Sequence, residues 1–153
     1  MQRVEGKTHN REMNQSIAIT FGEPEHGWLP VDFSYRDFRL HFTASDVLND
    51  PMAELYSALV SLDSTAPQNI TWWLEPEAYF FELEKEASHF SLTITETENL
   101  HNGKMPKRQL IKITGTEKEI IAPLRISLKQ FSAKTHDKKH WPFDLKKDNV
   151  DKL

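Results

Sequence analysis

The alternation of apolar and polar side chains between residues 79 and 95 constrains the fold of this chain most strongly. The apolar positions are Tyr79, Phe81 and Leu83 in a first segment and Phe90, Leu92 and Ile94 in a second. A period of two is typical of a strand with one buried face and one hydrated face. We therefore expect an antiparallel hairpin, closed by about five residues from Lys85 to His89.

The same alternation predicts further strands in residues 17–21, 28–35, 38–43, 70–75 and 110–114. Asp50 followed by Pro51 is typical of a helix start, and apolar residues at three- and four-residue spacing predict a helix over about residues 51–62. A second helix is expected over about residues 122–133, with Pro123 in its first turn and an extended segment before it. Thr116 and Glu119 favour an earlier start, but an interior proline costs about 3 kcal/mol.

These elements predict an α+β fold. We expect a single, mostly meander antiparallel sheet of about six or seven strands, with both helices on one face. The opposite face would be polar, and would be hydrated or would hold a partner. Trp141 and Phe143 are too large and apolar for a solvated tail, so we expect them to dock on the body of the domain.

A chain of 153 residues suits one domain. We expect a disordered extension in residues 1–15, an α+β domain in residues 16–143 and a flexible charged tail in residues 144–153. The N-terminal residues lack the apolar region of a secretory signal, and no apolar run approaches the ~20 residues that cross a bilayer. The chain has no cysteine, which excludes disulfides and a thiolate zinc site. A cytoplasmic protein without a membrane partner is the expectation.

The net charge of −4 conceals a strong asymmetry along the chain. Residues 23–100 hold 15 acids and three strong bases, whereas residues 101–153 hold 13 bases and six acids. Either the two segments neutralise each other within the fold, or the protein carries separate charged surfaces that steer partners. The sequence leaves both alternatives open.

Candidate binding residues lie on the predicted polar face. Trp72 and Trp73 point to opposite sides of one strand, so Trp73 is expected outside, beside Glu82 and Glu84. An exposed tryptophan among charges is a common anchor for a protein partner. The other interpretation, slightly favoured by the sequence, is that the segment from Trp141 to Phe143 covers Trp73. The alternative is a small enzyme or ligand carrier, with a groove lined by Arg39, His41, Glu82 and Glu84.

Motifs for catalysis are missing from the sequence. No serine has a Gly-x-Ser-x-Gly setting, and the five glycines do not form a phosphate-binding loop. His136 and His140 are four residues apart, but their segment lacks a helix signal and contains two lysines that repel a cation. We predict no catalytic residue, metal or cofactor.

The sequence therefore favours a non-enzymatic protein-binding module. A small, acidic, cysteine-free domain has the profile of bacterial immunity and antitoxin proteins, or of an accessory protein. The expected partner is a protein with a basic surface, or a second copy of the chain in a homo-oligomer. The lysines near the C-terminus lack a nucleic-acid-binding motif, so nucleic acid is not the favoured partner.

Overall fold

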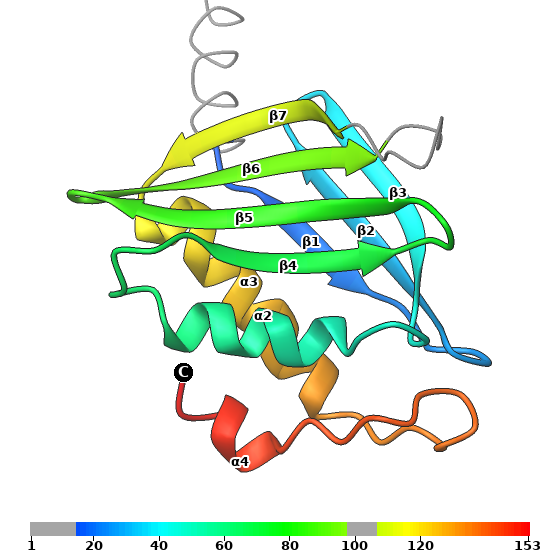
Figure 1. The fold of residues 1–153 in the computed structure, drawn as a ribbon. Helices are drawn as coiled ribbons and strands as arrows, with labels where there is room; N and C mark the ends of the chain where they lie inside the picture. Colours follow the sequence, from blue (N-terminus) through cyan, green and yellow to red (C-terminus); the bar gives the residue numbers. More distant parts are fainter. Residues whose placement is uncertain (1–14, 98–106) are drawn as a thin grey trace, which may run out of the picture.

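Two antiparallel sheets, rather than one, form the centre of the protein (Figure 1). The computed structural model describes residues 15–97 and 107–153. Sheet A has the order β1-β2-β3, with bounds Ala18–Phe21, Trp28–Tyr35 and Phe38–Ser45. Sheet B has the order β4-β5-β6-β7, with bounds Gln68–Trp73, Ala78–Glu86, His89–Thr97 and Lys107–Gly115. The α+β class and the antiparallel pairing are confirmed, whereas the single sheet is wrong.

The helices lie together on one side of the two sheets (Figure 1). Helix α2 (Pro51–Val60) joins β3 to β4 and runs alongside β4, and helix α3 (Glu117–Ser132) follows β7. Helix α3 contacts β1 of sheet A and β6 and β7 of sheet B, so it closes the space between the sheets. The short α4 (Lys147–Val150) packs on α3.

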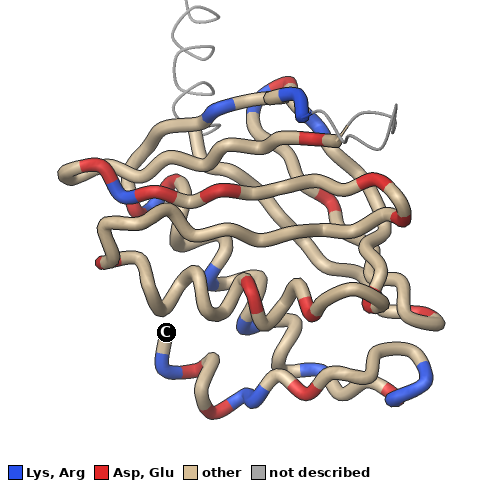
Figure 2. Tube along the Cα trace, in the orientation of Figure 1, with Lys and Arg blue, Asp and Glu red and all other residues tan. Residues whose placement is uncertain are grey.

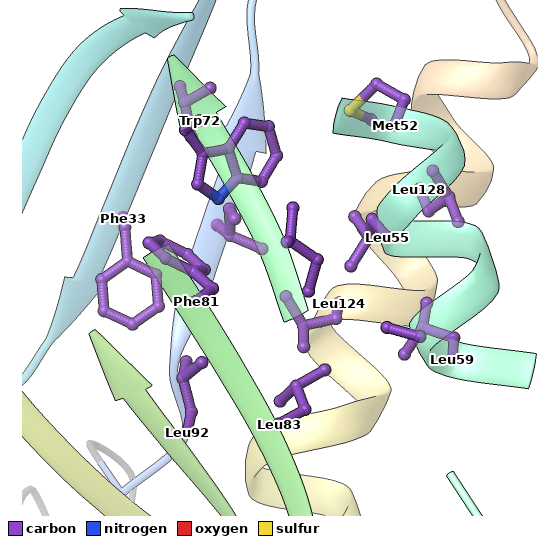
Figure 3. Packing of buried hydrophobic residues seen from close by; sticks show 14 of the residues in the cluster. Phe33, Met52, Leu55, Leu59, Trp72, Phe81, Leu83, Leu92, Leu124 and Leu128 are labelled. Atoms are coloured by element: carbon purple, nitrogen blue, oxygen red, sulfur yellow. The ribbon is translucent and has the colours of Figure 1, made fainter. Parts of the chain in front are cut away.

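The core lies between the inner faces of the sheets and the two long helices. The rings of Phe33 in β2 and Phe81 in β5 are 5.6 Å apart between centroids, which places the inner faces in direct contact. Leucines of α2 and α3 point toward the same core (Figure 3). The predicted hairpin forms with its apolar stripes in register, since Leu83 pairs with Leu92.

The reason for two sheets lies between β3 and β4. Alternation along a strand indicates which side chains are buried, but it does not indicate which strands pair. Here α2 lies between these two strands in the chain, and the Thr71 backbone at the outer edge of β4 bonds to side chains instead of to a strand. Its N–H donates to Glu54 Oε1 at 2.8 Å, and its carbonyl accepts from Asn49 Nδ2 at 2.9 Å. Side chains thus satisfy the backbone N–H and carbonyl of Thr71, which a neighbouring strand would otherwise bond.

Helix α3 begins at Glu117, so the extended segment predicted before Pro123 is wrong. The capping box forms: Thr116 Oγ1 accepts from the Glu119 N–H at 3.2 Å, and Glu119 Oε1 accepts from the Thr116 N–H at 2.9 Å. Pro123 lies inside the helix and cannot donate to the Glu119 carbonyl four residues earlier. That carbonyl accepts from the Ile17 N–H at 3.0 Å, which offsets the lost bond.

Four other predictions concern one loop and the two ends of the chain. The β5–β6 loop has two residues instead of about five, because Glu86 pairs with His89 and Ala87 adopts a φ of 55°.

Trp141 is 2% exposed, and the centroid of its ring lies 6.5 Å from that of the Phe131 ring, which confirms that this segment docks on the domain. The predicted flexible tail, residues 144–153, includes α4, in which Val150 is buried. The predicted N-terminal extension lies outside the described residues, except for residue 15.

Candidate functional site

The outer face of sheet B carries the predicted binding anchor. Trp72 points into the core and is fully buried, so its neighbour Trp73 points outward, where it is half-buried. This face is turned toward the reader in Figure 1, and none of the helices in the described part of the chain crosses it. The adjacent tryptophans therefore divide between core and surface, as the strand period predicts.

An aromatic floor is the most distinctive feature of this face. Phe80 of β5 also points outward, and its ring lies 6.4 Å from the Trp73 ring in an edge-to-face arrangement. Lys107 Nζ lies 4.3 Å from the centroid of the Phe80 ring, within the range of a cation–π interaction. Phe80 was missed by the sequence reasoning, although it has the same strand parity as Glu82.

Polar side chains surround the Phe80 part of this floor and form a shallow depression, which Trp73 does not line. Its volume is about 520 Å³, and its lining residues are Asn69, Thr71, Phe80, Glu82, Thr95 and Lys107. Strand pairing explains the set, because Thr71, Phe80 and Thr95 face one another across β4, β5 and β6. The depression offers an aromatic surface with hydroxyl, amide, carboxylate and ammonium groups, which suits contact with another molecule.

The charges on this face are mixed. Glu82 and Glu84 are half-exposed on β5, while β7 brings Lys107 and Lys112 to the same sheet. Lys112 Nζ lies 3.9 Å from Glu86 Oε1, at the limit of an ion pair. Figure 2 shows carboxylates along β5 and basic residues on β7. Antiparallel pairing thus neutralises part of the acidic segment with the basic one.

The other predicted residues lie on a different sheet. Arg39 and His41 point outward from β3, and they line a separate depression of about 250 Å³ built from β1, β2 and β3. His41 Nδ1 lies 2.5 Å from Asp32 Oδ1, and both side chains are exposed. Because the inner faces of the sheets pack together, the structure does not bring Arg39 and His41 together with Glu82 and Glu84.

His136 and His140 have separate environments. The His136 ring stacks on Phe131 with centroids 4.8 Å apart, and neither ring nitrogen has a hydrogen-bond partner among the described residues. Its Nδ1 lies 3.8 Å from Glu23 Oε1, at ion-pair distance. His140 Nδ1 accepts from the His26 N–H at 3.0 Å. Across residues 15–97 and 107–153, no group of three or more metal-ligating side chains is close enough to hold a metal ion.

Comparisons with known proteins found no match. No protein-family model matches the chain, and neither a curated protein nor a solved structure matches it. Among the described residues, no helix combines the length and apolar character needed to cross a membrane.

Proposed function

We propose that this protein is a non-enzymatic protein-binding module that docks its partner on the outer face of sheet B. One observation carries the proposal: Trp73 and Phe80 form an aromatic pair on the polar outer face of sheet B, and both side chains are half-buried. Large aromatic side chains in such positions lose exposed apolar area when a partner covers them. The flanking carboxylates Glu82 and Glu84 then supply charged contacts.

The geometry of these carboxylates favours binding over acid–base chemistry. Glu82 and Glu84 lie two residues apart on one strand face, and both are half-exposed. A pair of carboxyl groups that supplies both the general acid and the general base requires contrasting environments, which hold one group protonated and the other ionised. Two similar positions on an open sheet do not provide that contrast.

The proposed partner is a protein with a basic patch beside an apolar contact. The basic patch would face Glu82 and Glu84, and the apolar contact would cover Trp73. An immunity or antitoxin protein, or an accessory subunit, would use such a surface to hold its target. A homo-oligomer is a second form of the same proposal.

The alternative is a small enzyme or ligand carrier that uses Arg39, His41, Glu82 and Glu84. The hydrogen bond between His41 and Asp32 favours it, because a carboxylate can orient an imidazole for proton transfer. Because the four side chains lie on two different sheets, the depression lined by Arg39 and His41 on sheet A would act as a separate site, without Glu82 and Glu84.

The test is an affinity measurement with substitutions on each sheet. The full chain is used to isolate its partner from the native lysate, and binding of the purified partner is then measured by calorimetry. Trp73→Ala with Glu82→Lys should weaken binding about 100-fold, since central aromatic anchors contribute several kcal/mol. The matched control, Arg39→Ala with His41→Ala, should change affinity less than about threefold. Unchanged affinity in the first variant would eliminate this surface.

A further inference from the structure

Three loops meet at one end of the protein and form a second surface. They are residues 22–28, which join β1 to β2 and include the first residue of β2, residues 45–50, which join β3 to α2 and include the last residue of β3, and residues 74–77 between β4 and β5. We call them together the acidic loop end. In Figure 1 they lie at the right-hand side, where β3 and β4 finish and β2 and β5 begin.

Hydrogen bonds join the three loops to one another. The Asp46 N–H donates to the Gly27 carbonyl at 2.9 Å, which joins the first two loops. The hydroxyl of Ser45 donates to Glu75 Oε2 and accepts from the Val47 N–H, which adds the third. The loops therefore hold a defined relative position.

Exposed apolar side chains are concentrated at this end. Trp28, Val47 and Leu48 expose 40%, 68% and 60% of their surfaces, and they are three of the five large apolar residues that are exposed in the described chain. Trp28 pairs with Ser45 across β2 and β3, so it lies beside the segment that carries the other two. Clustered exposed apolar residues are typical of interaction surfaces.

The fixed charges of the three loops themselves are all negative. The three loops contain no lysine or arginine. Besides Asp50, which caps α2, their carboxylates are Glu23, Glu25, Asp46, Glu75 and Glu77. A fourth loop touches this end through His140, whose carbonyl accepts from the Gly27 N–H at 2.8 Å, and it brings two lysines nearby. The two lysines are Lys138 and Lys139. Lys138 Nζ forms an ion pair with Asp144 Oδ2 at 2.6 Å.

We propose that the acidic loop end is a docking surface for a basic protein. Trp28, Val47 and Leu48 would make the apolar contact, and the carboxylates of the three loops would face lysine and arginine side chains of the partner. Charge complementarity selects this occupant, since an acidic or neutral protein would gain no attraction from a surface of one sign. The inference goes beyond the docking face on sheet B and uses different residues.

The test uses a synthetic amphipathic peptide of leucine and lysine as the probe, and the same peptide with glutamate for lysine as the control. Amide chemical shifts of the full chain are followed by NMR during the titration. The largest shifts should map to residues 22–28, 45–50 and 74–77, and the affinity should fall as salt is added. The glutamate peptide should not bind.

Two variants of the acidic loop end separate its apolar and charged parts. Val47→Ser with Leu48→Ser should weaken binding of the lysine peptide about tenfold. Glu25→Lys with Glu77→Lys should weaken it about tenfold or more. The side chains of Glu25 and Glu77 make no hydrogen bond or ion pair with another residue that the structure describes, and Val47 and Leu48 are largely exposed, so both variants should fold.

Asp37→Lys with Asp148→Lys makes the same change of charge at two exposed positions outside both the acidic loop end and the outer face of sheet B. This matched control should change peptide affinity less than about twofold. The proposal is overturned if this control weakens binding equally, if the shifts map elsewhere, or if the glutamate peptide binds as well. Self-association that disappears in Val47→Ser with Leu48→Ser would also overturn it and assign the surface to a second copy. Glu82→Lys with Glu84→Lys is measured separately, because it weakens any peptide binding at the outer face of sheet B and so distinguishes failure of the acidic loop end from failure of the sheet B face.

Discussion

The outer face of sheet B and the acidic loop end both contain strands or loops from the acidic segment, residues 23–100, yet they differ in charge. On sheet B, pairing of β6 with β7 brings Lys107 and Lys112 from the basic C-terminal segment beside the glutamates of β5. At the loop end, three loops from residues 22–77 meet one another, and none carries a lysine or arginine. Pairing with β7 therefore neutralises part of the negative charge on sheet B, whereas the three loops have no basic strand beside them in the described part of the chain and stay acidic.

The two surfaces also differ in how they are held. The sheet face is fixed by four paired strands, so one outward side chain can change without moving its neighbours. The loop end depends on individual bonds, such as the one between Asp46 and Gly27. We therefore expect substitutions at the outer sheet face to affect binding alone, whereas some at the loop end affect the fold as well.

The largest expected effect separates the two tryptophans of β4. Trp72→Ala should lower the free energy of unfolding by about 3–5 kcal/mol, because the side chain is fully buried against Phe21, Phe42 and Phe81. Trp73→Ala should cost less than about 1 kcal/mol. Urea unfolding followed by circular dichroism measures both. Equal losses would contradict the view that the Trp73 face is a surface.

A smaller effect is expected at Gly27, which has a φ of 86°. Gly27→Ala should cost about 1–2 kcal/mol, because residues with a side chain disfavour this backbone conformation. An added Cβ would also lie 2.6 Å from Asp46 Oδ1. Adding Asp46→Ala removes this close approach but not the backbone cost, so the double variant should recover little stability in urea unfolding. Full recovery would show that the Asp46 contact, rather than φ, requires glycine.

The smallest effect concerns Asp50, the carboxylate of the loop end that caps α2. Its side chain accepts from the Ala53 N–H at 3.2 Å, so Asp50→Ala should cost about 1 kcal/mol, whereas Asp50→Asn should retain the cap. Burial raises the pKa of Asp50 above its ordinary value of 3.8, so the folded state binds this proton more tightly. The contribution of that proton to stability is therefore present at low pH and is lost as the pH rises through the raised pKa.

This pH dependence can be isolated by comparing the wild type with Asp50→Asn. The stability of the wild type relative to the variant should fall as the pH rises through the pKa of Asp50, because asparagine does not titrate. Chemical denaturation at a series of pH values measures the difference. A relative stability that rises over the same range would mean that the cap lowers the pKa of Asp50 instead.

The candidate surfaces could be predicted from the sequence in part. Strand parity placed Trp73, Glu82 and Glu84 outside because the two faces of a strand alternate at every residue. The same argument placed Arg39 and His41 outside, but it could not state that they lie on another sheet. The acidic loop end was not predicted, because Trp28, Val47 and Glu75 are far apart in sequence and have no periodic relation.

The local pattern of the chain by itself determined the α+β class, the β5–β6 hairpin, the start of α2 and the inward or outward direction of most strand residues. Those features depend on neighbouring residues, so spacing along the chain is sufficient to find them. The tertiary structure alone decided the division into two sheets and the tolerance of Pro123 within α3, where Ile17 supplies the missing donor. Both depend on contacts between distant segments, whose free energy outweighs a local preference of a few kcal/mol.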